Sequence, residues 1–182
     1  PGGRPAMMFP VETVTVQNTN DGGAGSLRKA LGTVCVGGTI NFDPALAGQT
    51  ITLLSGPLTL GKNATIDGFA APGLSVSGNN AVRVFEVSAG ATATVKYLNV
   101  TNGYGWQLGG GIINNGSLTL DHVSVTNNTM ATNAGDYWQG GGGIYNGDGS
   151  TLNLIDSSVS NNNAAWSGGG VYGFFNSKVS IL

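Results

Sequence analysis

The feature that most constrains the fold is a motif of three glycines followed by an aliphatic residue. It begins at Gly109, Gly141 and Gly168 and reads GGGII, GGGIY and GGGVY. The starts are 32 and 27 residues apart, and each motif precedes a short alternating run such as Leu118-Thr119-Leu120. Repetition at a spacing of about 20 to 50 residues is the signature of solenoids and related repeat architectures.

A second stretch repeats in phase with the first, in residues 95–102 (VKYLNVTN), 120–127 (LDHVSVTN) and 154–161 (LIDSSVSN). Its alternation has a period of two residues, which indicates strands with one apolar face. The aligned columns are Val95/Leu120/Leu154, Val100/Val125/Val159 and Asn102/Asn127/Asn161. We expect the Val and Leu columns to stack inside, and the Asn column to form a ladder of side-chain amides at a corner.

These patterns predict an all-β protein, a right-handed single-stranded parallel β-helix in which each strand pairs with its copy one coil above. In the first half, the expected strands are residues 12–16, 39–42, 50–54, 58–60, 64–66, 74–76 and 82–87. The run SLRKAL from Ser26 predicts a short capping helix with Leu27, Ala30 and Leu31 on one face. We divide the chain into an N-terminal extension (1–10), a cap strand and capping helix (11–45), and coils with an open C-terminal end (46–182).

The composition excludes several classes of protein. Only 9% of residues are charged and the net charge is -2, with no cluster of Lys or Arg, so we expect no nucleic-acid partner. No apolar run approaches the roughly 20 residues of a membrane span. With one cysteine, Cys35, and one histidine, His122, an internal disulfide and a Cys/His zinc site are excluded. We therefore predict no cofactor and no metal site, and we interpret Cys35, in the run TVCV, as a buried structural thiol.

The chain also resembles a known group of proteins. Residues 15–31 (TVQNTNDGGAGSLRKAL), followed by residues 38–44 (GTINFDP), resemble the N-terminal cap of bacterial secreted β-helix proteins, where a Ser-Leu-Arg-x-Ala helix follows a first strand. Residues 141–146 (GGGIYN) are similar to the repeats of chlamydial polymorphic outer-membrane proteins. The resemblance covers nearly the whole chain. It implies an extracellular or cell-surface location and a role in adhesion or as a structural passenger, and it carries over no catalytic residue.

An incomplete last coil ending at Leu182 favours two readings. The chain is part of a longer one, or copies join through unpaired strand edges into a homo-oligomer or a head-to-tail polymer. The partner expected for an adhesive rod is a surface glycan or a host or cell-surface protein. The predicted function is thus a structural or adhesive β-helix rod.

The candidate ligand-binding residues are aromatic and precede the glycine triplets in the repeat. They are Tyr104, Trp106, Tyr137, Trp138 and Trp166. On successive coils they would form a stripe that binds a sugar ring or a partner surface, because exposed aromatic rings bind with little loss of side-chain entropy. The alternative is that these rings pack against the loops and cover the corner.

The enzymatic alternative is a polysaccharide lyase or glycosidase, which requires clustered carboxylates. The candidates Asp67, Asp121, Asp136, Asp148 and Asp156 are scattered through the repeat. The alignment places Asp121 opposite Ile155 and Asp156 opposite His122, so that His122 and Asp156 could touch. An enzyme would be favoured if Asp67, Arg83 and Lys96 shared one groove. We predict no catalytic residue.

Four sequons predict surface glycosylation sites, at Asn63, Asn99, Asn115 and Asn127. An Asn/Thr-rich composition also generates such sequons by chance, and Asn127 belongs to the corner column. Their Asn residues are therefore interpreted as mostly structural.

Overall fold

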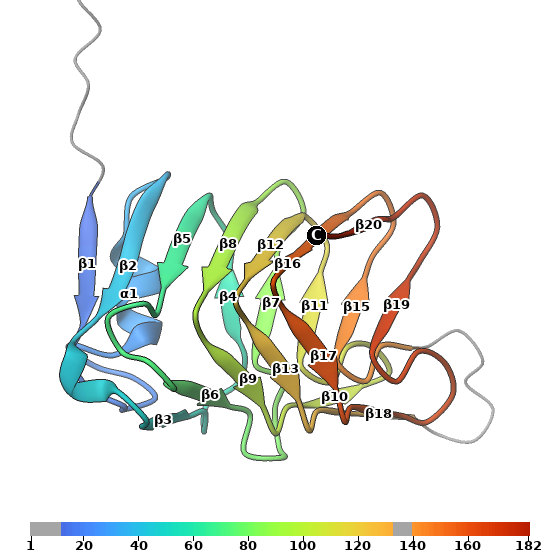
Figure 1. Ribbon diagram of the computed structural model, residues 1–182, viewed down its shortest axis with the longest axis horizontal. Coiled ribbons are helices and arrows are strands. Elements are labelled where there is room, and N and C mark those ends of the chain that lie inside the picture. The colour runs from blue at the N-terminus through green and yellow to red at the C-terminus, as the bar shows by residue number, and fades with distance from the viewer. Residues whose placement is uncertain (1–11, 133–139) are drawn as a thin grey trace, which may run out of the picture.

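The computed structural model describes residues 12–132 and 140–182, which form a parallel β-solenoid of about six turns (Figure 1). The predicted parallel β-helix with one short helix is confirmed. Successive coils lie side by side along the long axis, and the helix lies at the N-terminal end of the stack. Every pair of neighbouring strands in the four sheets runs parallel.

Each sheet contains one strand from each of several coils. Sheet 1 contains β1 (Thr13–Val16), β2 (Gly38–Phe42), β5 (Ala64–Asp67), β8 (Thr92–Lys96), β12 (Ser117–Asp121), β16 (Thr151–Ile155) and β20 (Lys178–Ile181). Sheet 2 contains β3 (Thr50–Thr52), β6 (Ser75–Ser77), β9 (Asn99–Thr101), β13 (Ser124–Thr126) and β17 (Ser158–Ser160). Sheet 3 contains β4 (Leu58–Leu60), β7 (Phe85–Val87), β11 (Ile112–Asn114), β15 (Ile144–Asn146) and β19 (Val171–Gly173). Sheet 4 contains β10 (Tyr104–Trp106), β14 (Thr129–Ala131) and β18 (Asn163–Ala164).

The strand register confirms the predicted apolar columns. Leu120 pairs with Val95 on one side and Leu154 on the other. Val125 lies in the same way between its two valine partners, Val100 and Val159. Apart from Val159, which is partly buried, these side chains are at most 5% exposed and belong to one continuous core.

The first two glycine triplets occur where the backbones of neighbouring coils approach closely. A Cβ atom on Gly110 would lie 2.3 Å from the carbonyl oxygen of Gly142, and one on Gly142 would lie 2.5 Å from that of Gly169. No side chain fits at such a distance. The first glycine of each triplet has a positive φ, 47° at Gly109 and 82° at Gly141, which glycine adopts without strain. Backbone geometry therefore requires the triplet in the first two motifs, whereas Cβ atoms on Gly169 and Gly170 in the third would lie 3.0 Å and 3.7 Å from their nearest neighbours.

The asparagine ladders form at positions other than the predicted column. Asn102, Asn127 and Asn161 occupy a corner with φ of 50°, 57° and 53°, a region that asparagine tolerates. The amide-to-amide hydrogen bond lies one residue later, where Asn128 Nδ2 donates to Asn162 Oδ1 at 2.9 Å. The prediction of an amide ladder in the corner column was therefore wrong by one position, because backbone conformation rather than side-chain pairing selects asparagine at the corner.

A second ladder joins Asn114 to Asn146 at the ends of β11 and β15. Asn114 Nδ2 donates to Asn146 Oδ1 at 2.7 Å and to the carbonyl oxygen of Thr151 at 2.9 Å, while its Oδ1 accepts from the Gly116 amide. Both asparagines are fully buried. Their amides therefore satisfy backbone groups inside the stack.

Helix α1 (Leu27–Thr33) packs at the first coils as expected, with Leu27, Ala30 and Leu31 buried. Ser26 caps it by accepting a hydrogen bond from the Lys29 amide. Arg28 fastens the helix to the loop before β4, since it donates to the carbonyl oxygens of Gly56 (2.7 Å) and Pro57 (2.8 Å). A short 3-10 turn, η1 (Pro44–Leu46), was not predicted.

The expected strands of the first half are all present, with bounds that shift by up to three residues. The prediction for Cys35 was wrong, because its side chain is exposed. The run TVCV is not a strand. Val34 ends the helix and is buried, whereas Cys35 and Val36 lie in the turn that follows.

The buried asparagine ladder yields a stability prediction. Replacing Asn114 by Ala leaves Asn146 Oδ1 and the Gly116 amide without a partner, and we expect a loss of about 1–3 kcal/mol in the free energy of unfolding. Asn115→Ala, at the exposed neighbour, is the control and should change it by less than about 0.5 kcal/mol. Chemical denaturation measures both, and equal effects of the two variants would show that the ladder is not stabilising.

Candidate functional site

The predicted tryptophan stripe is placed only in part by the structure. Trp106, in β10, is 49% exposed, and Trp166, which follows β18, is 53% exposed. Trp106 pairs with Ala131 on the next coil, so an aromatic ring does not follow it in register. Tyr104 is half-buried. Tyr137 and Trp138 lie outside the described residues.

A more compact group of aromatic side chains lies at the corner between sheet 1 and sheet 2. Tyr97, His122 and Asp156 each follow the last residue of a sheet 1 strand and have φ of 52°, 56° and 44°. The Tyr97 amide donates to the carbonyl oxygen of Asp121, and the His122 amide to that of Ile155. Continuous hydrogen bonding between coils therefore places these three residues above one another.

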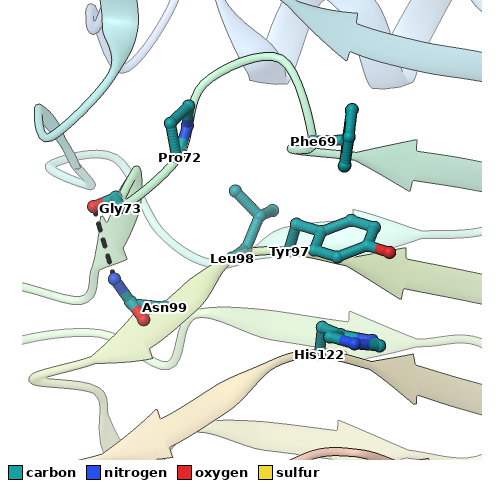
Figure 2. A pocket seen from close by; sticks show the side chains of 7 residues that line it. All are labelled: Phe69, Pro72, Gly73, Tyr97, Leu98, Asn99 and His122. Carbon is teal, nitrogen blue, oxygen red and sulfur yellow. Dashed lines mark hydrogen bonds between the residues drawn. The ribbon is translucent and has the colours of Figure 1, made fainter.

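The rings at this corner form a short column (Figure 2). The centroids of Tyr97 and His122 are 4.8 Å apart, with an angle of 34° between the ring planes. Phe69, which follows the corner after β5, contacts Tyr97 edge to face, with centroids 5.2 Å apart and an interplanar angle of 69°. Phe69 is 71% exposed, so most of its ring remains accessible.

A groove with a volume of about 380 Å³ runs beside this column. In addition to the three rings, Pro72, Gly73, Leu98 and Asn99 line it. Figure 2 shows Phe69 and Pro72 on either side of the opening and Leu98 and Tyr97 below it. Asn99 fixes the far wall, where its Nδ2 donates to the carbonyl oxygen of Gly73 at 3.3 Å and to Ser75 Oγ at 3.2 Å. We call this feature the corner groove.

Charged side chains lie beside His122, next to the corner groove but outside its lining. Asp121 accepts a hydrogen bond from His122 Nδ1 at 2.7 Å and pairs with Lys96 Nζ at 3.2 Å. The Nε2 atom of His122 lies 3.9 Å from Asp156 Oδ2, as the sequence alignment suggested. The hydrogen bond from His122, with further help from Lys96, outweighs partial burial and keeps the pKa of the Asp121 carboxyl below its usual value.

Asp67, Arg83 and Lys96, the residues expected to share a groove in a lyase, do not lie together in one groove. Asp67 and Lys96 are neighbours in register on β5 and β8. Arg83 lies two residues before β7. It donates to the carbonyl oxygens of Leu108 (2.6 Å) and Gly109 (2.7 Å) and pairs with Glu86. Its guanidinium therefore holds the first glycine motif and does not join Asp67 and Lys96.

The remaining predictions concern the surface. Asn63, Asn115 and Asn127 are exposed, whereas Asn99 is partly buried and has its amide engaged in the groove wall. Within residues 12–132 and 140–182, no three His, Cys, Asp or Glu side chains are grouped to hold a metal ion. In the same residues, no helix has the length and apolar character needed to cross a membrane.

The aromatic column was not predicted, although part of its signal was in the sequence. The aligned stretches already place Tyr97, His122 and Asp156 in one column. Phe69 lies beyond them in a looser coil and could not be aligned. Comparisons with protein-family models, with curated proteins and with solved structures found no match for this chain.

The lowered pKa of Asp121 yields a prediction about pH. A carboxyl whose pKa is lower in the folded state stabilises the fold above its unfolded pKa of about 3.9 and loses that contribution as the pH falls through the folded pKa. Asp121→Asn should therefore lower the free energy of unfolding by up to about 1 kcal/mol near neutral pH, and the difference should disappear in strong acid. Thermal unfolding at several pH values measures this. A difference that does not change with pH would contradict it, and Asp148→Asn serves as the exposed control.

Proposed function

We propose that this chain is an extracellular or cell-surface β-helix rod with a structural and adhesive function. The observation that carries the proposal is the display of large aromatic side chains on a rigid stack. Phe69, Trp106 and Trp166 are 71%, 49% and 53% exposed, respectively, on coils whose strands are paired in register. Rings fixed on a rigid surface lose little entropy on binding, which suits them to hold a partner.

The charges at the corner support binding better than catalysis. A carboxyl that acts as a general acid near neutral pH needs a raised pKa, and that of Asp121 is lowered. The carboxylate is also engaged by Lys96 and His122. A β-solenoid is compatible with non-enzymatic structural roles as well as with enzymes. The engagement of Asp121 argues only against this carboxyl as a general acid.

The proposed location is supported by the sequence. The chain combines few charged residues with a high content of glycine, 32 of 182, and it resembles bacterial exported β-helix proteins at its N-terminal segment and in its GGGIYN motif. An antibody raised against the purified chain should label intact cells of the source organism or its culture medium. Labelling only after the cells are opened would contradict the proposed location.

The adhesive function is tested by the retention of coated beads under flow. Beads that carry the chain should be retained on a polysaccharide-coated or matrix-protein-coated surface and released when Phe69, Trp106 and Trp166 are all replaced by Ser. Phe175→Ser, at another exposed ring, is the control and should preserve retention. Failure of the unmodified chain to hold any surface, or equal retention by the triple variant, would contradict the proposal.

End-to-end association is a second part of the proposal. Val179 and Ile181 in β20 continue the columns of Leu152 and Leu154, but they are 43% and 77% exposed. A strand of a second copy paired with β20 would cover them.

Charging this edge should therefore abolish assembly. We expect large species in multi-angle light scattering for the unmodified chain and monomers for Ile181→Lys. Ser180→Lys, which changes the alternate face of the same strand, should leave assembly intact. A monomer whose mass does not depend on concentration would contradict self-association.

A further inference from the structure

The shape of the corner groove fits a flat ring with apolar faces. The exposed ring of Phe69 forms one wall and Pro72 the other, while Tyr97 and Leu98 form the floor (Figure 2). The planes of Phe69 and Tyr97 meet at 69°, so that wall and floor are nearly perpendicular. The volume of about 380 Å³ lies in the range of small-ligand sites and is large enough for a sugar ring.

The groove is also rigid. Tyr97 is supported from below by the His122 ring at 4.8 Å, and the far wall is held by the hydrogen bonds of Asn99 to Gly73 and Ser75. Leu98, which forms the floor with Tyr97, is 2% exposed and belongs to the core. A ligand would therefore meet a preformed surface, which reduces the entropy lost on binding.

The charge around the groove is negative. Asp67, at the end of β5, accepts a hydrogen bond from the Phe69 amide, and Asp121 and Asp156 both contact His122. Two groups oppose these three carboxylates: the ammonium group of Lys96, which is already paired with Asp121 at 3.2 Å, and the imidazole of His122, which carries a charge only when it is protonated. Asp156 is the most accessible of the carboxylates, with 70% of its side chain exposed. The surroundings therefore favour a cationic ligand and disfavour an anionic one.

We infer that the corner groove binds an amino sugar of the glucosamine type. The C–H face of the pyranose lies against Phe69 and its edge meets Tyr97, while the ammonium group faces the carboxylates beside His122, Asp156 above all. This inference rests on the proposed adhesive function and names its ligand class. It also moves the glycan site from the tryptophans before the glycine triplets to the corner between sheets 1 and 2.

The charge is tested with three tetrasaccharides that differ in charge. We expect isothermal titration calorimetry, at about pH 6 and low salt, to show the glucosamine tetramer bound about tenfold more tightly than the N-acetylglucosamine tetramer, and the galacturonate tetramer not bound. The preference for the free amine should shrink in about 1 M salt, where the Debye length is short.

Two variants and their controls locate the site. Asp156→Asn keeps a residue type that tolerates the φ of 44° and should weaken binding of the glucosamine tetramer several-fold while leaving the N-acetylated one unchanged. Phe69→Leu should weaken both tetramers. Asp148→Asn and Phe175→Leu make the same changes at other exposed positions and should have no effect. Since Phe69 and Asp156 are mostly exposed, the fold should persist, which circular dichroism checks.

The inference is overturned if no tetramer binds, if the N-acetylated or galacturonate tetramer binds as tightly as the glucosamine tetramer, or if Asp156→Asn and Phe69→Leu bind like the unmodified chain. Retention of coated beads separates this failure from that of the proposed function. Beads that still adhere while no tetramer binds would show that the chain is adhesive through another ligand. Beads that do not adhere, together with no bound tetramer, would contradict both the inference and the adhesive function, whereas a bound tetramer without adhesion would contradict the adhesive function alone.

Discussion

The structure depends on the parallel hydrogen bonding of each coil to the next. This pairing sets strands about 4.8 Å apart along the axis and places equivalent residues directly above one another. Each position must then tolerate a similar neighbour on both sides. Valine and leucine satisfy this in the interior, asparagine amides satisfy it by donating to one neighbour and accepting from another, and glycine satisfies it where a carbonyl oxygen of the next coil occupies the space of a Cβ atom, as at Gly110.

The same constraint produces the corner groove. Tyr97 has a φ of 52°, which is uncommon for a bulky residue, yet it recurs at His122 and Asp156 because all three turn the chain at the same point of the coil. Their side chains are thereby stacked at the spacing of the strands, and the rings of Tyr97 and His122 are 4.8 Å apart. The site needs no specialised loop for its floor. Only the wall formed by residues 69–73 departs from the regular corner.

The sequence was sufficient to predict the fold, because the repeats identify equivalent residues directly. Val95, Leu120 and Leu154 occupy the same position of the sequence repeat and are paired in the structure. The sequence was insufficient to predict which side chains meet wherever neighbouring coils differ in length or residue type. Phe69 and Tyr97 share a corner without sharing a motif, and Cys35 looked like part of an apolar strand although the helix before it ends in a turn. The ladder of side-chain amides lies one position after the predicted column. Asparagine is selected for its positive φ at Asn127 and for amide pairing at the next residue, Asn128, so the sequence alone does not distinguish the two roles.

The fastening of α1 to the loop before β4 has a consequence for how the chain reaches this structure. Arg28 bonds to Gly56 and Pro57, which follow it by 28 and 29 positions in the chain. The helix and the first coil can therefore close before any later coil exists. Each later strand of sheet 1 can then pair with the strand of the coil before it, which has already formed. Growth in this direction follows the order of synthesis, so a chain that emerges slowly from a ribosome or a narrow export channel would meet a finished template at each step and would need no contact with residues still to come.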